Sequence, residues 1–292
     1  MEKAKDTLKE MVQDTISSQK LSFDGFMGLS NDNMTIPFTL NNQTSSVLVM
    51  GKPNMGENEL LRTIIYSVMA HTNPKQLQVA IIDGKGDNHR LLGDSKNPFL
   101  YAPIPDASKD KYYISYSRSI IKEIVDECKD RFELFKANGV SNIENYNLQN
   151  EETALPIIWL VITDFDYLVA LDGEVNAVLG RRVADNLEYL IKMGRSLGIR
   201  VLLSTHFADT RRIPLKISQN IPNRIAFSLR NHNETQFAFG KTRAKAERIK
   251  RKGMFITNFP KHGLMDGHTL AIDLNKANEL NDQLRNQFRK ED

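Results

Sequence analysis

The chain has 292 residues, which is enough for one large α/β domain or two small ones. No apolar stretch approaches the roughly 20 residues that span a bilayer, and we expect no secretory leader, because the first residues lack an apolar core. The net charge of +3 is near balance and gives little support for a nucleic-acid partner. The single Cys128 excludes an intramolecular disulfide and a cysteine metal cluster, which is typical of the reducing cytoplasm.

The two ends of the chain differ from its middle. Residues 1–20 are polar with apolar side chains at helical spacing, which predicts a short lead-in helix. Residues 276–292 predict a polar C-terminal helix over Lys276–Lys290, with apolar side chains four residues apart. Between them, residues 21–275 contain no internal repeat and no low-complexity linker, so we expect one domain there.

Strands and helices alternate through most of this domain. Residues 21–46 are rich in Asn, Ser and Gly and predict short strands and turns. Later strands are predicted at 47–50, 77–82, 157–162, 201–204, 224–229, 254–256 and 269–274. Helices are predicted at 60–70, 118–138, 175–194 and 243–252. Such alternation predicts an α/β fold with a mostly parallel central sheet and helices on both faces.

A glycine loop follows the first buried strand. Its spacing is that of the phosphate-binding loop G-x-x-x-x-G-K-[S/T], which joins a strand to a helix. Its sequence is Gly51-Lys52-Pro53-Asn54-Met55-Gly56-Glu57-Asn58. Glu57 stands where the phosphate-binding lysine belongs, and Asn58 where the hydroxyl that holds Mg²⁺ belongs. A carboxylate there repels phosphate, so the loop has the frame of a nucleotide site without its chemistry.

Polar residues also follow two other buried strands. Strand 157–162 continues into Thr163-Asp164-Phe165-Asp166, and strand 201–204 continues into Thr205-His206. The carboxyl ends of parallel strands meet at one edge of a sheet, so we expect these residues near the glycine loop. In phosphate-loop hydrolases, an acid pair at such a strand end holds Mg²⁺ and polarises the attacking water.

Together these residues resemble the FtsK/SpoIIIE group of RecA-like P-loop motor ATPases over roughly residues 21–275. The resemblance rests on an ordered set of stretches and not on the loop alone. They are residues 49–58, 81–86, 131–135, 139–147, 155–168, 194–199, 203–206 and 220–227. The chain is most similar to the last ATPase domain of the EssC/EccC family, the membrane-anchored coupling proteins of type VII secretion. The resemblance implies a RecA-like P-loop NTPase fold.

The departures from the family pattern cluster where hydrolysis tolerates them least. Asn54 replaces a loop glycine, in addition to the changes at Glu57 and Asn58. Thr163-Asp164 stands in place of the Asp-Glu pair of Walker B; a shift of one residue makes Asp164 the metal acid and Phe165 the lost base. His206 stands where the family tends to have Gln, at a sensor-like position. We therefore expect a vestigial site at Gly51, Lys52, Asn54, Gly56, Glu57, Asn58, Thr163, Asp164 and His206, with no ATP or weak ATP/Mg²⁺ binding and no turnover.

The resemblance also implies partners and a place in the cell. It implies secreted helical WXG-type substrate proteins, neighbouring ATPase domains of the same chain and a hexameric homo-oligomer in the full machine. It implies a cytoplasmic domain of a protein anchored in the cell membrane, which recognises substrates and couples protein export, with no nucleic acid bound. Two alternatives remain: an active ATP-driven translocation motor, and a DNA-handling module.

Simpler interpretations exist for each residue. Glu57 is also a favourable acid at the start of a helix, and Asp164 and Asp166 also suit a strand end. Lys52 offers an alternative phosphate contact, and His206 is also explained as a satisfied strand-end histidine. The basic run from Lys241 to Lys252 is explained by a solvated helix face, with Ala244, Ala246 and Ile249 turned partly inward, or by an acidic partner. The histidines are too scattered for us to propose a metal site.

Overall fold

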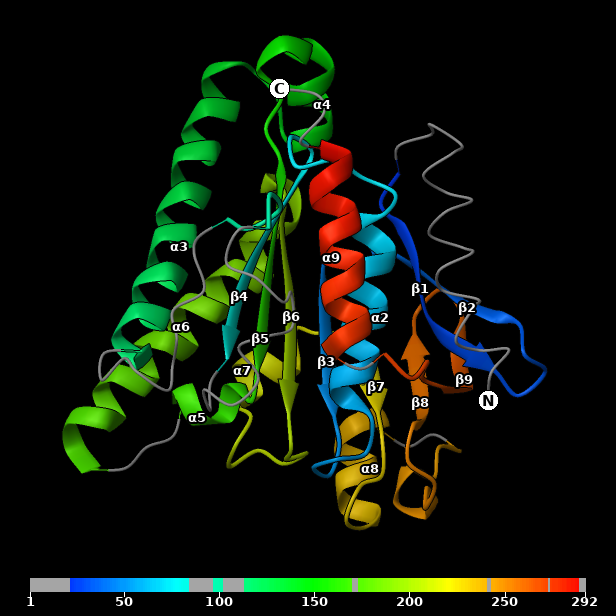
Figure 1. The fold of residues 1–292 in the computed structure, drawn as a ribbon. Helices are drawn as coiled ribbons and strands as arrows, with labels where there is room; N and C mark the ends of the chain where they lie inside the picture. The colour runs from blue at the N-terminus through cyan, green and yellow to red at the C-terminus, as the bar shows by residue number, and fades with distance from the viewer. Residues whose placement is uncertain are drawn as a thin grey trace.

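The computed structural model describes residues 22–83, 97–101, 113–169, 173–240, 243–272 and 274–288 (Figure 1). The predicted lead-in helix 1–20 and the Gly84–Gly86 part of the family match lie outside these residues. Within the described chain, one sheet of nine strands has the order β2-β1-β9-β8-β7-β3-β6-β5-β4. The predicted α/β P-loop fold class is confirmed, with a sheet that is mixed and has a parallel half.

The parallel half contains the longest buried strands. Its strands, in spatial order, are β7 (Asn223–Ala226), β3 (Ser46–Met50), β6 (Ile199–Thr205), β5 (Ile157–Thr163) and β4 (Leu77–Asp83). All residues of β5 and β6 are buried, as near-continuous apolar runs predict for strands covered on both faces. Trp159 of β5 lies in the core and stacks on Phe38 with ring centroids 6.0 Å apart.

The antiparallel half extends the sheet beyond β7. It consists of β8 (Met254–Phe259), β9 (Gly263–His268), β1 (Asp24–Ser30) and β2 (Thr35–Thr39). The short strands predicted within residues 21–46 are therefore present, as β1 and β2. They close the far edge of the sheet after the chain turns at Asn33, which has a φ of 58°.

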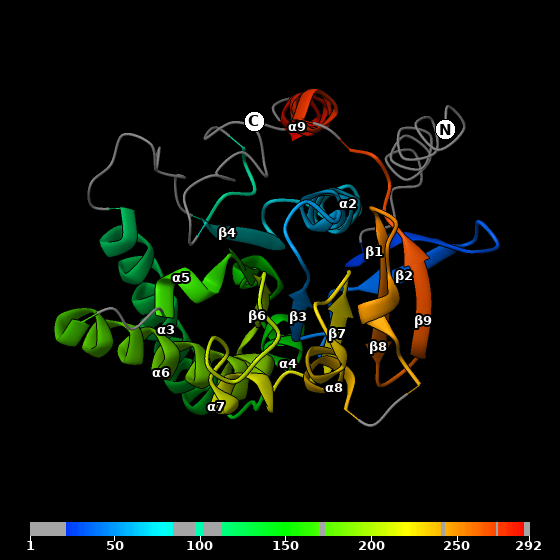
Figure 2. The same ribbon diagram turned by 90° about the horizontal axis from the view of Figure 1, so that it is seen from below.

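Helices cover both faces of the sheet, as predicted. Figure 2 shows α2 (Glu57–Met69) and α9 (Leu274–Phe288) on one face, and α6 (Gly173–Leu197), α7 (Leu215–Ser218) and α8 (His232–Phe239) on the other. The remaining helices are α3 (Tyr113–Ala137), α4 (Ile143–Gln149), α5 (Phe165–Val169) and the 3-10 turns η1 (Glu151–Thr153) and η2 (Ala246–Arg248). Cys128 is fully buried on α3, where burial raises the pKa of its thiol to about 11. None of the described helices is both long enough and apolar enough to cross a membrane.

The predicted C-terminal helix is confirmed as α9, and it packs on the domain. Leu280 and Leu284 are buried, and Phe288 meets Phe99 edge to face with centroids 5.4 Å apart. Figures 1 and 2 both place α9 alongside α2. The division of the chain into residues 1–20, 21–275 and 276–292 stays a prediction.

Two predicted elements are wrong. Residues 269–272 form no strand; the alternation of Leu270 and Ile272 comes from a buried irregular segment, and the strand lies earlier, at β9. The predicted helix 243–252 is only the short turn η2, whose flanking residues have non-helical backbone angles. Ala244 and Ala246 do turn inward, but the segment around them is irregular.

Candidate functional site

The loop between β3 and α2 needs both of its glycines for steric reasons. A Cβ on Gly51 would lie 2.7 Å from Cβ of Phe227. Gly56 precedes α2 with a φ of 114°, and a Cβ there would lie 2.9 Å from Cα of Gly253. Because side chains rarely adopt that backbone conformation, this position favours glycine whatever the loop binds. The glycine frame therefore has a packing explanation that is independent of nucleotide.

Hydrogen bonds hold the two ends of this loop to different strands. The amide of Lys52 donates to the carbonyl of Ser228, just beyond β7, at 2.9 Å. The carbonyl of Met55 accepts from the amide of Gly253, just before β8, at 2.8 Å. Through its bond to Ser228, the amide of Lys52 is part of the backbone framework. The residue itself is half-buried.

The middle of the loop keeps free donors. Within the described part of the chain, the amides of Asn54, Met55 and Gly56 have no hydrogen-bond acceptor. Asn54 has a φ of 63°, the left-handed conformation that asparagine tolerates better than most residues. Free amides at the start of a helix suit an anion, because the helix dipole adds positive potential there. The backbone therefore retains the capacity of a phosphate site.

Beside this loop, the side chains of Glu57, Asp164 and His206 form an ionic cluster. Nδ1 of His206 lies 3.4 Å from Oε2 of Glu57 and 3.2 Å from the carbonyl oxygen of Gly51. Nε2 of His206 lies 3.0 Å from Oδ1 of Asp164. Glu57 and Asp164 are both buried, at 7% and 1% exposure. The imidazole therefore joins the glycine loop to the end of β5.

The charges of this cluster depend on one another. The bond to Asp164 is the largest cause that raises the pKa of His206 to about 9, and Glu57 adds to it, while burial opposes both. Burial raises the pKa of Glu57 to about 7, partly offset by His206. At neutral pH the imidazole is therefore protonated, and a cation stands between two buried acids.

A third buried acid, Asp166, lies close to this cluster. Asp166 is 1% exposed, and its Oδ1 accepts from the hydroxyl of Thr205 at 2.8 Å. Burial is the largest cause that raises the pKa of Asp166. Thr205 also accepts from the amide of Phe207 at 3.1 Å, so the end of β6 is fixed in place. The sequence places Asp166 and Thr205 after two buried strands, but it does not predict the hydrogen bond between them.

Arg230 is a neighbour that sequence reasoning missed. Its guanidinium donates to the carbonyl of His206 at 2.8 Å and lies 3.2 Å from Glu234. Arg212 and Arg230 each lie 4.7 Å from the ring centre of Phe207. The available signal was position, since Arg230 follows β7 toward the same edge as His206.

The predicted site residues thus separate into two groups. Gly51, Glu57, Asp164 and His206 are brought together. Lys52, Asn54 and Gly56 lie in the loop, Asn58 lies at the start of α2, and Thr163 lies at the end of β5, where it pairs with Asp83 across the sheet. Among the described residues, no group of His, Cys, Asp and Glu side chains has the geometry of a metal site.

Comparison with known proteins agrees with this architecture. The model of the FtsK/SpoIIIE family matches residues 8–257. The DNA translocase FtsK of Staphylococcus epidermidis is 26% identical over 265 residues, which cover 85% of this chain and 30% of the translocase. The chain therefore spans less than a third of that relative's length.

Two solved structures have a similar fold. EssC (ATPases 2 and 3) from Geobacillus thermodenitrificans has a TM-score of 0.74 at 20% identity, covering 94% of this chain and 51% of that one. The pCW3 conjugation coupling protein TcpA, solved with ATPγS, has a TM-score of 0.73 at 19% identity, covering 91% and 71%. At these identities the likeness concerns the fold.

Proposed function

The chain belongs to the FtsK/SpoIIIE family, and from that premise we propose that it is a P-loop module that does not hydrolyse ATP and serves recognition and coupling in a larger machine. The observation that carries the proposal is the contact of His206 with both Glu57 and Asp164. In an active site of this kind, a lysine and Mg²⁺ supply the positive charge between loop and strand. Here the imidazolium of His206 supplies that positive charge.

The residues fit only part of the ligand that the family implies. Free amides at Asn54, Met55 and Gly56 and the start of α2 suit a phosphate group. When Glu57 is ionised, its carboxylate opposes one: at ~4 Å and an effective dielectric near 20 the repulsion between two unit charges is about 4 kcal/mol. The imidazolium of His206 already neutralises the acids that would otherwise attract a divalent cation. ATP and Mg²⁺ would supply energy and charge in a functional relative, and these side chains support weak nucleotide binding at most.

The fold likeness to EssC supports a role in protein secretion. We propose that this is the C-terminal ATPase-fold module of a type VII secretion coupling protein, as a cytoplasmic part of a membrane-anchored chain. Its partners would be helical WXG-type substrates and neighbouring ATPase domains. The fold likeness to EssC and the share of that chain left uncovered, about half, support the presence of further domains.

Calorimetry with Mg²⁺-ATP tests the inactive pocket. We expect no measurable heat with the unmodified chain, and recovered nucleotide affinity when Asn54→Gly, Glu57→Lys and Asn58→Thr are combined with His206→Gln. The last change is needed because the new lysine would otherwise face the imidazolium. Glu59→Lys, on the same helix, is the matched control and should bind nothing. Tight binding or sustained phosphate release by the unmodified chain would support the active motor instead.

A DNA-handling role is the second candidate, because the sequence relative is a DNA translocase. It predicts duplex binding whose affinity falls steeply with salt. Fluorescence anisotropy with a labelled duplex at low salt measures this directly. Salt-sensitive duplex binding by the unmodified chain would favour this candidate over a secretion module, and absence of binding would remove it.

A further inference from the structure

A cavity lies at the opposite edge of the sheet from the glycine loop. It has a volume of about 400 Å³. Asn223 begins β7, while Thr44 and Arg195 come shortly before β3 and β6, so the cavity lies at the amino edge of the parallel strands. Lys261 joins it from the turn between β8 and β9. The cavity is therefore separate from the site described above.

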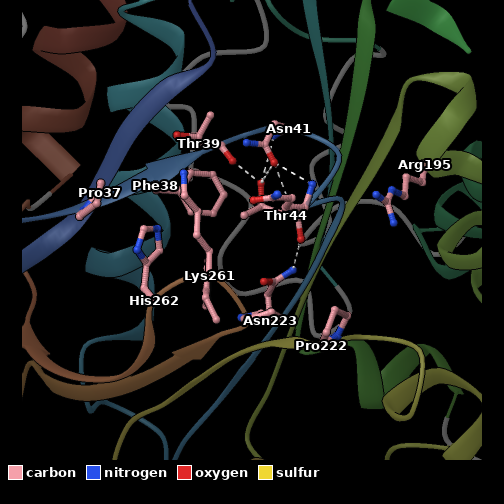
Figure 3. Close-up of a pocket in the computed structure, with 13 residues that line it drawn as sticks. Pro37, Phe38, Thr39, Asn41, Thr44, Arg195, Pro222, Asn223, Lys261 and His262 are labelled. Carbon is pink, nitrogen blue, oxygen red and sulfur yellow. Dashed lines mark hydrogen bonds between the residues drawn. The ribbon is translucent and has the colours of Figure 1, made fainter.

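Positive side chains line this cavity on two sides. Figure 3 shows Lys261 and His262 on one side and Arg195 on the other. No acidic side chain lines it, and in the part of the chain that the structure describes no carboxylate lies within 4.0 Å of Arg195 or Lys261. Among the described residues, no carboxylate therefore neutralises Lys261 or Arg195 at the rim.

A buried side chain near this rim is positively charged as well. Arg200 is buried and donates to the carbonyl of the rim residue Arg195 at 2.9 Å, and the half-exposed carboxylate of Glu144 is 4.0 Å away. Burial lowers the pKa of Arg200 to about 10; Glu144 opposes the shift and the nearby Arg195 adds to it. An anion in the cavity would relieve this crowding of cations.

The floor of the cavity is apolar and its polar wall is already hydrogen-bonded. Phe38 and Phe259 meet edge to face, with ring centroids 6.4 Å apart. The side-chain amide of Asn223 donates to the carbonyl oxygens of Gln43 and Ser46, at 2.8 and 2.9 Å. The wall is therefore held in place before any ligand arrives, which reduces the entropy lost on binding.

We propose that this cavity binds a carboxylate carried on an apolar body. A volume of this size matches small-molecule sites, which combine apolar walls with a few polar anchors. Exposed Lys261 and Arg195 suit one negative charge, while the rings of Phe38 and Phe259 suit an aliphatic or aromatic group. Two sources carry this chemistry: a free organic acid, and the C-terminal carboxylate of a polypeptide.

Titration calorimetry at neutral pH and low salt tests the site with three probes: acetyl-Leu-Phe with a free carboxylate, its C-terminal amide, and 3-phenylpropionate. We expect the dipeptide acid to bind at least about 10-fold more tightly than the amide, because only the acid pairs with the rim cations. Tighter binding of the dipeptide than of phenylpropionate assigns the site to a chain end, and the reverse order assigns it to a free acid. Either order supports the proposal.

Charge reversal locates the binding. Lys261→Glu and Arg195→Glu, on opposite sides of the cavity, should each weaken the dipeptide acid by about 10-fold. Arg211→Glu makes the same charge change at the other edge of the sheet, on a side chain that is 89% exposed, and should change affinity less than about two-fold. Equal binding of acid and amide, absence of binding, or reversal variants that melt like the parent and bind equally would overturn the proposal.

Discussion

The two edges of the parallel sheet both bury charge, but they neutralise it differently. At the amino edge, buried guanidinium groups bond mainly to main-chain oxygens, although Arg131 also pairs with Glu127 at 2.7 Å. Arg131 donates to the carbonyls of Pro156 and Leu197 at 2.9 and 3.0 Å, and Arg200 donates to those of Arg195 and Ile199 at 2.9 and 3.1 Å. These cations hold chain segments together.

At the carboxyl edge, side chains neutralise one another instead. His206 stands between Glu57 and Asp164, and among the main-chain oxygens of the described residues its ring contacts that of Gly51 alone. Side chains that pair with side chains can be replaced as a set without loss of the backbone framework. These amino-edge cations are therefore committed to the fold, whereas the side chains of the carboxyl edge can change without loss of the fold.

The largest effect should come from the amino edge. Arg131→Met leaves two buried carbonyls without donors, so we expect the free energy of unfolding to fall by about 3–4 kcal/mol. Lys129→Met, at a 57% exposed side chain of the same helix, should cost less than about 0.5 kcal/mol. Urea denaturation measures both. Equal small effects would mean that Arg131 does not hold these segments.

The next effect is dependent on pH. The pKa of His206 is raised from 6.5 to about 9, so its stabilisation is complete below pH 6.5 and is lost as the pH rises through about 9. The raised pKa of Glu57 acts in the same direction between about 4.5 and 7. We expect the free energy of unfolding to fall by about 1–3 kcal/mol between pH 6.5 and 9, and His206→Gln to abolish most of that fall.

Chemical denaturation across this pH range measures the effect. His232→Gln is the control, because that side chain is 66% exposed and 3.9 Å from Glu247. A His206→Gln protein that keeps the full slope would show that the cluster is not the titrating unit.

A smaller effect should distinguish backbone strain from steric crowding at Gly56. Gly56→Ala meets both a φ of 114° and the close approach of Gly253, and should cost about 2 kcal/mol. Gly139→Ala has a φ of 67° with no atom within 4 Å of the added Cβ, and should cost about 1 kcal/mol. Thermal unfolding compares the two. A larger cost at Gly139 would contradict the packing role of Gly56.

The smallest effect should come from the exposed partner of a buried cation. Glu144→Gln removes a half-exposed carboxylate that lies 4.0 Å from Arg200, and we expect a cost below about 0.5 kcal/mol. Two carbonyl groups and the side chain of Asn42 already accept hydrogen bonds from Arg200, so its longer contact with Glu144 adds little. A cost close to that of Arg131→Met, measured by the same urea titration, would break the contrast between the two edges.

Sequence patterns predicted every strand of the parallel half, whereas in the antiparallel half they missed β9. The strands β5 and β6 are buried on both faces, so each has a continuous apolar run that stands out from its surroundings. Most of β9 is exposed and contains two glycines, so no alternation marks it. Leu270 and Ile272 show the alternation instead, because they are buried for tertiary reasons.

The candidate site divides in the same way. Topology alone predicted that Glu57, Asp164 and His206 would share an edge, since each follows or begins an element there. The direction of the imidazole, turned between the two acids, depends on packing between segments over a hundred residues apart. Arg230 was missed for the same reason, because its contact with the carbonyl of His206 has no local sequence signal.

The bond between Met55 and Gly253 gives the glycine loop a mechanical role. One end of the loop is tied to β7 through Lys52, and the other is tied to the start of β8, where the parallel half gives way to the antiparallel half. The loop therefore links the parallel half of the sheet to the antiparallel half. A rotation of one half against the other must break or stretch these hydrogen bonds, and a ligand that makes the loop more rigid must resist that rotation.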